Sequence, residues 1–157
     1  MAIEIERKFL LADDSWREQV ERSIDMRQGY FCNTDRASLR VRIEGDRARI
    51  GVKSMTHAMR RTEFEYPVPV EEARVMLDEM CQPSIIVKTR HLLHFEGHLW
   101  EIDEFHGDNE GLLVAEIELG SEAESFARPE WLGEEVTDDP RYLNFRLATQ
   151  PFKDWTT

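Results

Sequence analysis

Acidic and basic side chains recur at every second position in several short segments of this sequence. The first example lies near the N-terminus, where Glu4, Glu6 and Lys8 alternate with Ile5 and Phe9 among others. Successive side chains of an extended strand point to opposite faces, so these three charged residues are expected to share one face. Two neighbouring carboxylates repel each other unless a cation lies between them. This stretch therefore raises the hypothesis of a metal site.

The same spacing continues along the chain as ExExK, RxR, RxExE, KxR, ExD and ExE. Its members are Glu4, Glu6, Lys8, Arg40, Arg42, Lys53, Arg61, Glu63, Glu65, Lys88, Arg90, Glu101, Asp103, Glu116 and Glu118, with Arg49 as a further cation. An ordinary solvent-facing sheet surface mixes its charges and places opposite signs together. Repeated like charges lower stability unless a ligand of opposite sign lies between them. Acidic pairs therefore predict a cation, and basic pairs predict a polyanion.

The residue types narrow the chemistry of both ligands. Neither cysteine nor histidine falls in phase with the acidic pairs, and a set of oxygen donors favours Mg²⁺ or Mn²⁺ over zinc. Arginine and lysine pairs suit phosphate oxygens. The chain has no glycine-rich phosphate-binding loop, so side chains must hold the phosphates. The pattern predicts a site for a metal-bound polyphosphate.

Strands are expected to position these charges. Alternating segments predict eight strands, at residues 3–10, 28–31, 39–43, 48–52, 61–68, 84–90, 98–105 and 113–119. Gly45 and Asp46 lie between two of them and predict a tight hairpin. The face opposite the charges is almost entirely apolar in the seven clearest strands; its exceptions are Arg7, Thr62, Thr89 and Glu104. We expect that apolar face to be the buried one.

Helical signals are fewer. Apolar spacing predicts a helix over residues 70–80, and residues 13–23 predict another short one. Residues 121–124 fit a capping box at the start of a helix. Asp139 followed by Pro140 resembles a helix N-cap with proline at the first helical position, which would open a helix over 141–148.

Length and charge limit the class of protein. The chain has 157 residues with 20 Lys+Arg against 32 Asp+Glu, so we expect one domain, 1–157, and no general binding to nucleic acid or an anionic membrane. Cys32 and Cys81 have no metal-type spacing, and MAIEIE does not resemble a secretory signal. A soluble cytoplasmic protein is expected. The oligomeric state, monomer or homodimer, is left open.

Histidines do not extend the metal hypothesis. His91 and His94 fall on opposite faces of a strand, and with His98 they are expected to have surface or packing roles. His57 lies between two predicted strands, where a loop near the site is expected.

Taken in order, these motifs resemble the CYTH family of triphosphate tunnel metalloenzymes. That family includes adenylyl cyclases of one class, thiamine triphosphatases and bacterial inorganic triphosphatases. Besides the charged pairs, the chain has QGY at residues 28–30, Lys53, and a closing segment EEVTDDPRYLN at 134–144. The match spans residues 4–144. One departure is Pro140, where close bacterial relatives often have a basic residue.

The resemblance implies an α+β fold built on an eight-stranded antiparallel β-barrel, open as a tunnel, with a charged interior and helices packed outside. It implies a metal-dependent enzyme that hydrolyses inorganic triphosphate to pyrophosphate and phosphate, with two Mg²⁺ or Mn²⁺ ions and a small-molecule polyphosphate as substrate. The expected metal contacts are Glu4, Glu6, Asp103, Glu116 and Glu118. The expected phosphate contacts are Lys8, Arg40, Arg42, Lys53, Arg61, Lys88 and Arg90, of which Lys8, Lys88 and Arg90, with Tyr30, are also candidates for catalysis. Glu63, Glu65 and Glu101 are expected to contact the metal or to orient the groups that do.

Two alternatives remain open. An adenylyl cyclase, or a thiamine or nucleoside triphosphatase, on the same scaffold would need a pocket for an organic group. Of the four tryptophans, Trp100 lies on the apolar face, and Trp16, Trp131 and Trp155 are expected to pack in helices or the tail. The second alternative is a polyphosphate-binding module without catalysis.

Overall fold

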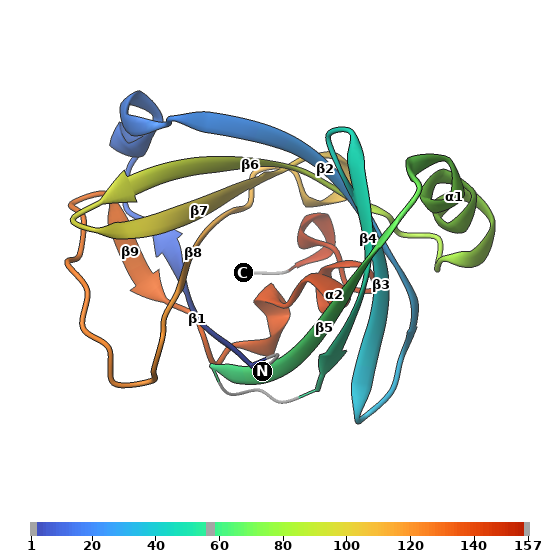
Figure 1. Cartoon of the computed structure of the whole chain (residues 1–157). Helices are drawn as coiled ribbons and strands as arrows, with labels where there is room; N and C mark the ends of the chain where they lie inside the picture. The colour runs from blue at the N-terminus through green and yellow to red at the C-terminus, as the bar shows by residue number, and fades with distance from the viewer. Residues whose placement is uncertain (1–2, 56–58, 156–157) are drawn as a thin grey trace.

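The computed structural model describes residues 3–55 and 59–155, and its main feature is an antiparallel β-barrel (Figure 1). The strands are β1 (Ile3–Leu11), β2 (Arg22–Asn33), β3 (Ala37–Glu44), β4 (Arg47–Ser54), β5 (Arg60–Val68), β6 (Ile86–Phe95), β7 (His98–Phe105), β8 (Leu113–Glu118) and β9 (Leu132–Glu135). The sheet order is β5-β4-β3-β2-β6-β7-β8-β1-β9, and β5 also pairs with β1. That last pairing closes eight strands into a barrel and leaves β9 outside it, which confirms the expected barrel.

Strand β1 closes the barrel by contacting a different partner along each part of its length. Residues 3–5 pair with β5, and residues 6–9 pair with β8. The end of β1 then pairs with the short β9. Sequence patterns missed β9 because its four residues, LGEE, do not alternate. A Cβ at Gly133 would lie 2.9 Å from the carbonyl oxygen of Leu10, so glycine is what allows β9 to approach β1.

The hairpin predicted at Gly45 and Asp46 is confirmed. Glu44 pairs with Arg47 across the turn, and Gly45 has a φ of 59°, a left-handed conformation that glycine adopts without steric cost. The hairpin fixes the register of β3 and β4. In that register the inward residues of β3 include Arg40 and Arg42.

The predicted helix at residues 70–80 is confirmed and packs on the outside of the barrel. It consists of α1 (Val70–Val75) and one turn of π-helix (Met76–Met80). Ala73 and Leu77 cover Val41, Ile43 and Ala48 of β3 and β4. The outer face of β5 is different, since Phe64 is 48% and Tyr66 57% exposed. The expectation that the apolar face is buried is therefore wrong for β5.

A second cluster covers the outside of β1, β7 and β8. It contains Phe9, Trp16, Trp100 and Trp131, all at most 1% exposed. Trp16 comes from a 3-10 helix, Ser15–Gln19, which is the helical part of the predicted segment 13–23; from Arg22 onward the chain is already β2. The Trp100 and Trp131 rings meet edge to face at 5.5 Å. These tryptophans are packing residues, as expected.

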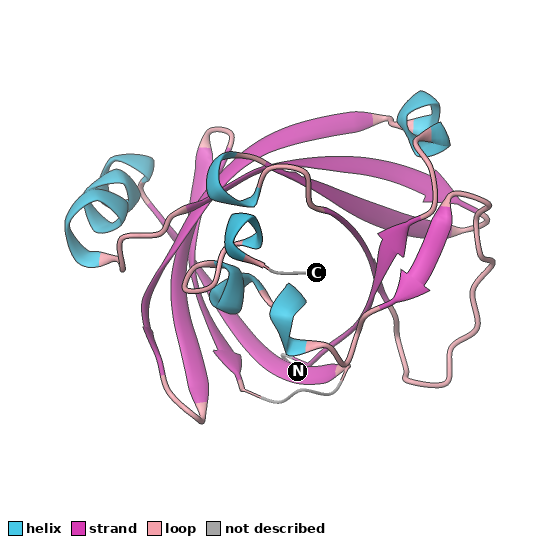
Figure 2. Ribbon diagram, turned by 180° about the vertical axis from the view of Figure 1, so that it is seen from behind, coloured by secondary structure: helices cyan, strands magenta, loops and turns pink. Residues whose placement is uncertain are grey.

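The C-terminal helices cover one end of the barrel rather than its outer wall (Figures 1 and 2). They are a 3-10 helix at Pro140–Tyr142, α2 (Asn144–Leu147) and a 3-10 helix at Phe152–Asp154. Asp139 caps the first, as predicted, by accepting a hydrogen bond from the Arg141 N–H. The single helix expected over 141–148 is interrupted, because Leu143 is extended, with φ −71° and ψ 133°.

These helices form a third cluster with the inward apolar residues of the strands. Tyr142 and Leu147 pack with Tyr30, Ile86 and Phe105 among others. The inward face of the strands is therefore apolar at this end of the barrel, and the C-terminal segment fills the barrel there.

The helix predicted to start at the capping box of residues 121–124 is absent from the described chain. Glu124 does reach back, because its carboxylate accepts a hydrogen bond from the Gly120 N–H at 2.6 Å and contacts His98 Nε2 at 2.6 Å. The segment forms only a turn and then extends toward Pro129. Phe126 packs on the barrel wall against Trp100. A helix over this segment would have no further apolar residues in phase to bury, so the extended chain with its Phe126 contact is favoured. None of the helices among the described residues is long and apolar enough to cross a membrane.

Candidate functional site

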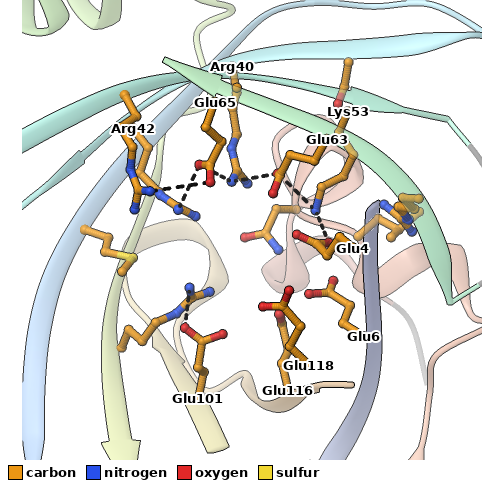
Figure 3. Close-up of a pocket in the computed structure, with 18 of the residues that line it drawn as sticks. Glu4, Glu6, Arg40, Arg42, Lys53, Glu63, Glu65, Glu101, Glu116 and Glu118 are labelled. Carbon is orange, nitrogen blue, oxygen red and sulfur yellow. Dashed lines mark hydrogen bonds and ion pairs between the residues drawn. The ribbon is translucent and has the colours of Figure 1, made fainter. Parts of the chain in front are cut away.

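The inside of the barrel contains a cavity of about 360 Å³ whose wall is mostly charged (Figure 3). Its lining includes every predicted site residue except Asp103, namely Glu4, Glu6, Lys8, Tyr30, Arg40, Arg42, Lys53, Arg61, Glu63, Glu65, Lys88, Arg90, Glu101, Glu116 and Glu118. Alternation along each strand places these side chains inward. The barrel thereby gathers residues that lie more than a hundred positions apart in the sequence.

Many residues of the charged face are buried as well. Lys88 is 1% exposed, Glu116 6% and Arg42 7%. Removing a charge from water is costly unless it is paired or solvated in some other way. The expectation that only the apolar face is buried is wrong for this reason: closure of the barrel encloses the charges.

Cations dominate one side of the cavity, which we call the basic side: Arg40, Arg42, Arg49 and Lys53 of β3 and β4, with Glu44, Glu63 and Glu65 between them. Arg40 Nη2 lies 3.6 Å from Glu63 Oε2 and 3.9 Å from Glu65 Oε2. Lys53 Nζ lies 2.8 Å from Glu4 Oε1 and 3.6 Å from Glu63 Oε2. Every cation on this side thus has a carboxylate within ion-pair distance.

Several of these pairs are too long to be hydrogen bonds. Among the described residues, the buried atoms Arg42 Nε and Glu63 Oε2 have no hydrogen-bond partner. Burial, with Arg40 and Arg90 nearby, lowers the pKa of Arg42 to about 10, so the guanidinium remains charged at neutral pH. The basic side therefore keeps an unused donor, Arg42 Nε, from which an anionic ligand can accept a hydrogen bond.

Carboxylates converge on the opposite side, which we call the acidic side: Glu6, Glu101, Glu116 and Glu118 of β1, β7 and β8 (Figure 3). Glu6 lies opposite Glu118 and Lys8 opposite Glu116 in the register of β1 and β8. Burial raises the pKa of Glu116, and the neighbouring Glu6 raises it further. Burial likewise raises the pKa of Glu118, with Glu4 adding to the effect. Lys8 Nζ lies 3.9 Å from Glu116 Oε1 and Arg90 Nη1 lies 3.0 Å from Glu101 Oε2, so these cations offset part of the repulsion, but the pKa values of Glu116 and Glu118 stay raised.

A divalent cation fits this chemistry. The donors are all carboxylate oxygens, which hard cations prefer, and a positive charge would relieve the repulsion that raises these pKa values. In the part of the chain that the structure describes, no three such side chains are yet gathered closely enough to form a ready-made metal site. Glu4 is instead held by Lys53.

Asp103 takes part in a buried ion-pair cluster just behind the cavity wall. It is fully buried, and its carboxylate accepts hydrogen bonds from Lys88 Nζ at 2.8 Å and from Arg90 Nε and Nη2 at 2.8 and 2.9 Å. These two cations hold the pKa of Asp103 far below its usual range despite burial. Burial lowers the pKa of Lys88 to about 8. Asp103 thus positions two cations that face the cavity.

The C-terminal segment adds polar groups that were not predicted as site residues. The Asn144 side-chain oxygen accepts hydrogen bonds from Lys88 Nζ at 2.9 Å and from Gln28 Nε2 at 3.2 Å. Lys8 Nζ donates to the Tyr142 carbonyl at 3.4 Å. Gln28 belongs to the QGY motif and Asn144 to the closing segment, but neither carries the charge that marked the other site residues.

Tyr30 and Arg61 lie where the sequence predicted. The Tyr30 hydroxyl accepts a hydrogen bond from Gln28 Nε2 at 3.2 Å, and the pKa of Arg40 is raised because nearby Tyr30 and Glu63 outweigh burial. Arg61 is 8% exposed and lies opposite Glu4 in the pairing of β1 with β5.

The histidines are dispersed, as expected. His91 contacts Glu104, His94 contacts Glu21 and His98 contacts Glu124, so each has its own carboxylate outside the cavity. His57 falls outside the described residues.

Comparison with known proteins agrees with this geometry. The model of the CYTH domain matches residues 2–147. The chain belongs to the CYTH family. An inorganic triphosphatase of Acetivibrio thermocellus is 43% identical over 155 residues, covering 99% of this chain and 99% of that protein. For an inorganic triphosphatase of Nitrosomonas europaea the identity is 37% over 149 residues, covering 92% of this chain and 96% of that protein.

A solved structure supports the same placement for this CYTH protein. The crystal structure of an inorganic triphosphatase, 37% identical, matches with a TM-score of 0.68 and covers 94% of this chain and 95% of that chain. The resemblance seen in the motifs is thereby confirmed.

Proposed function

We propose that this CYTH protein hydrolyses inorganic triphosphate to pyrophosphate and phosphate with the help of divalent metal ions. The observation that carries the proposal is the cavity itself, which has a basic side suited to phosphate oxygens and an acidic side suited to hard cations. The relatives at 43% and 37% identity, both named inorganic triphosphatases, support the same reaction.

The cations of the cavity bind the substrate in this proposal. Arg40, Arg42, Lys53 and Arg61 bind phosphate oxygens from the basic side and the adjoining wall, and Lys8, Lys88 and Arg90 do so near the C-terminal segment. Arginine offers two parallel hydrogen bonds to a phosphate, and lysine offers a compact charge. Lys88 and Arg90, held in place by Asp103, neutralise charge that develops on the phosphoryl group and the leaving oxygen. Lys8 and Tyr30 contribute to catalysis at the same end of the cavity in this proposal.

The carboxylates hold the metal. Glu4, Glu6, Glu116 and Glu118 are its ligands in this proposal, with two Mg²⁺ or Mn²⁺ ions. Such ions supply activation of water and neutralisation of phosphate charge when they are bound. Glu63, Glu65 and Glu101 orient the cations they contact. We predicted Asp103 as a metal ligand; its contacts favour the positioning role instead, since both of its oxygens already accept hydrogen bonds from Lys88 and Arg90.

The size and composition of the cavity favour a phosphate chain over an organic triphosphate. Its volume is about 360 Å³, and Trp16, Trp100 and Trp131 are buried in a cluster outside it. None of these three rings is available to stack on a base or a thiazole. A cyclase or a thiamine triphosphatase would have to hold its organic group in another way.

We also infer a single domain over 1–157, because the C-terminal helices pack into the barrel. The net charge of −12 supports a protein without nucleic-acid partners. Cys32 and Cys81 are both free thiols, which supports a reducing compartment such as the cytoplasm.

The test is phosphate release from tripolyphosphate, ATP and thiamine triphosphate in parallel, each with Mg²⁺, with Mn²⁺ and with EDTA. Fast release from tripolyphosphate that requires metal is the expected result. Preference for ATP or thiamine triphosphate would favour the organic alternatives, and formation of cyclic AMP would identify a cyclase. Tight binding of tripolyphosphate without release from any substrate would favour the binding module.

A further inference from the structure

Glu44 is a cavity carboxylate that the proposed reaction does not use. It is the last residue of β3, immediately before the hairpin turn, and it lines the cavity. Its side chain is 17% exposed, and its carboxylate lies 2.6 Å from Arg42 Nη2 and 2.9 Å from Arg49 Nη2. Glu44 therefore occupies the donors of two arginines that would otherwise face the cavity.

The position of Glu44 marks the end of a row of cations. Arg40, Arg42 and Glu44 follow each other at every second position of β3, so their backbones are about 6.6 Å apart at the usual strand rise of about 3.3 Å per residue. A phosphate chain bound along Arg40 and Arg42 would meet an anion at the next step. Arg42 and Arg49 outweigh burial and hold the pKa of Glu44 below its usual range, so the carboxylate is ionised at neutral pH.

Strand β2, which pairs with β3 beside Glu44, presents apolar side chains to the cavity. Ile24, Met26 and Leu92 line the cavity there, and Met26 lies directly opposite Glu44 in the pairing of β2 with β3. These side chains donate no hydrogen bonds. A phosphate there would depend on Arg90, which lies opposite Ile24, and on Arg42 and Arg49, whose donors Glu44 occupies. The other end of β2 is different, because Gln28 contacts the C-terminal segment. The C-terminal segment thus fills one end of the barrel, and Glu44 lies farther along β2 and β3, opposite the apolar Met26.

We propose that Glu44, held by Arg42 and Arg49, sets the length of the polyphosphate that the cavity accepts and selects against chains longer than three phosphates. This inference rests on the proposed function. Glu44 is a specificity-determining residue that acts by excluding a fourth phosphate, and it does not touch the reacting atoms.

The test compares tripolyphosphate with linear tetrapolyphosphate in the wild type and in Glu44→Gln. The amide keeps the shape of the side chain and removes its charge. Arg42 and Arg49 then keep only Glu65 as a charged partner, and their donors toward Glu44 become available to a further phosphate. The ratio of kcat/KM for tetrapolyphosphate to kcat/KM for tripolyphosphate should rise about tenfold, since like charges placed together in an enclosed site cost an interaction of about this size. An unchanged ratio would overturn the proposal.

Asp46→Asn is the matched control. It removes one carboxylate from the same hairpin, but Asp46 is exposed and does not line the cavity. Both substrates should be turned over as in the wild type. A ratio that rose equally in Asp46→Asn would mean that general charge, rather than Glu44, selects chain length, and would also overturn the proposal.

Binding measurements separate this inference from the proposed function. Calorimetry with both chains in EDTA reports affinity without turnover, and the affinity ratio should shift in Glu44→Gln in the same direction. If the wild type releases no phosphate from tripolyphosphate, the proposed function fails while the affinity ratio still decides the role of Glu44. If Glu44→Gln does not fold, Glu44→Ala replaces it; loss of the fold in both would make Glu44 a structural residue and overturn the proposal.

Discussion

The basic and the acidic sides of the cavity balance their charges in different ways. On the basic side, each cation has a carboxylate of the protein beside it, such as Glu63 beside Arg40 and Glu44 beside Arg42. On the acidic side, Glu116 and Glu118 lie among other carboxylates, and their pKa values are raised. The basic side is therefore balanced before substrate arrives. On the acidic side Lys8 and Arg90 offset only part of the negative charge, and bound protons or a cation would offset the rest.

This difference implies different costs of removing a charge. A substitution on the acidic side relieves repulsion in the metal-free protein but removes a metal ligand. A substitution on the basic side leaves a carboxylate without its partner and removes a phosphate contact.

The largest effect is expected on the acidic side. Glu116→Gln should lower kcat by roughly 10³-fold, the scale seen when a key electrostatic group of an active site is lost, while the metal-free protein keeps or gains thermal stability. Steady-state phosphate release and a thermal melt in EDTA measure the two quantities. Glu110→Gln, an exposed glutamate outside the cavity, is the control and should behave as the wild type. Full turnover by Glu116→Gln would remove Glu116 from the metal site.

A smaller effect is expected on the basic side. Arg40→Ala should raise KM by roughly 10- to 100-fold with a lesser change in kcat, because hydrogen bonds to charged groups contribute about 1.5–3 kcal/mol. It should also lower thermal stability, since Glu63 and Glu65 lose a cation. The exposed Arg36 provides the control Arg36→Ala. Unchanged KM and kcat in Arg40→Ala would contradict the assignment of phosphate binding.

The smallest effect concerns metal and pH. Because the folded-state pKa values of Glu101, Glu116 and Glu118 are raised, these groups bind more protons in the folded state than in the unfolded state. Their contribution to stability is present below the unfolded pKa, near 4.5, and is lost as pH rises through the folded values. Metal-free protein should therefore lose stability over that range.

Mg²⁺ should reverse this loss at neutral pH. A concentration about 100 times its Kd contributes about 2.7 kcal/mol, or roughly 5–10 °C in Tm for a chain of this size. Melts at several pH values with Mg²⁺ and with EDTA measure the difference, which should shrink at acidic pH. Equal stabilisation by Mg²⁺ at every pH would place its binding elsewhere than the acidic side.

Sequence reasoning succeeded where a strand's alternation determines which way a side chain points. Arg40, Arg42, Glu116 and Glu118 line the cavity because their strands place every second residue inward. The hairpin at Gly45 was predictable for a similar reason, since its turn has a local chemical signature.

Local sequence patterns could not predict the features that depend on closure of the barrel. Burial of Lys88 and exposure of Phe64 both follow from which face the curved sheet encloses. The contact of Asn144 with Lys88 depends on a C-terminal segment that folds back into the barrel. Glu44 was overlooked because it lies alone at a strand end, and only the structure places it beside Arg42 and Arg49.

The central claim is that the two sides of one cavity bind metal and phosphate respectively. A crystal structure of the protein with tripolyphosphate and Mn²⁺, collected at a wavelength where manganese scatters anomalously, tests it most directly. Manganese should lie beside Glu6, Glu116 and Glu118, and phosphate groups should lie beside Arg40 and Arg42. Manganese found away from these carboxylates, or tripolyphosphate bound outside the barrel, would contradict it.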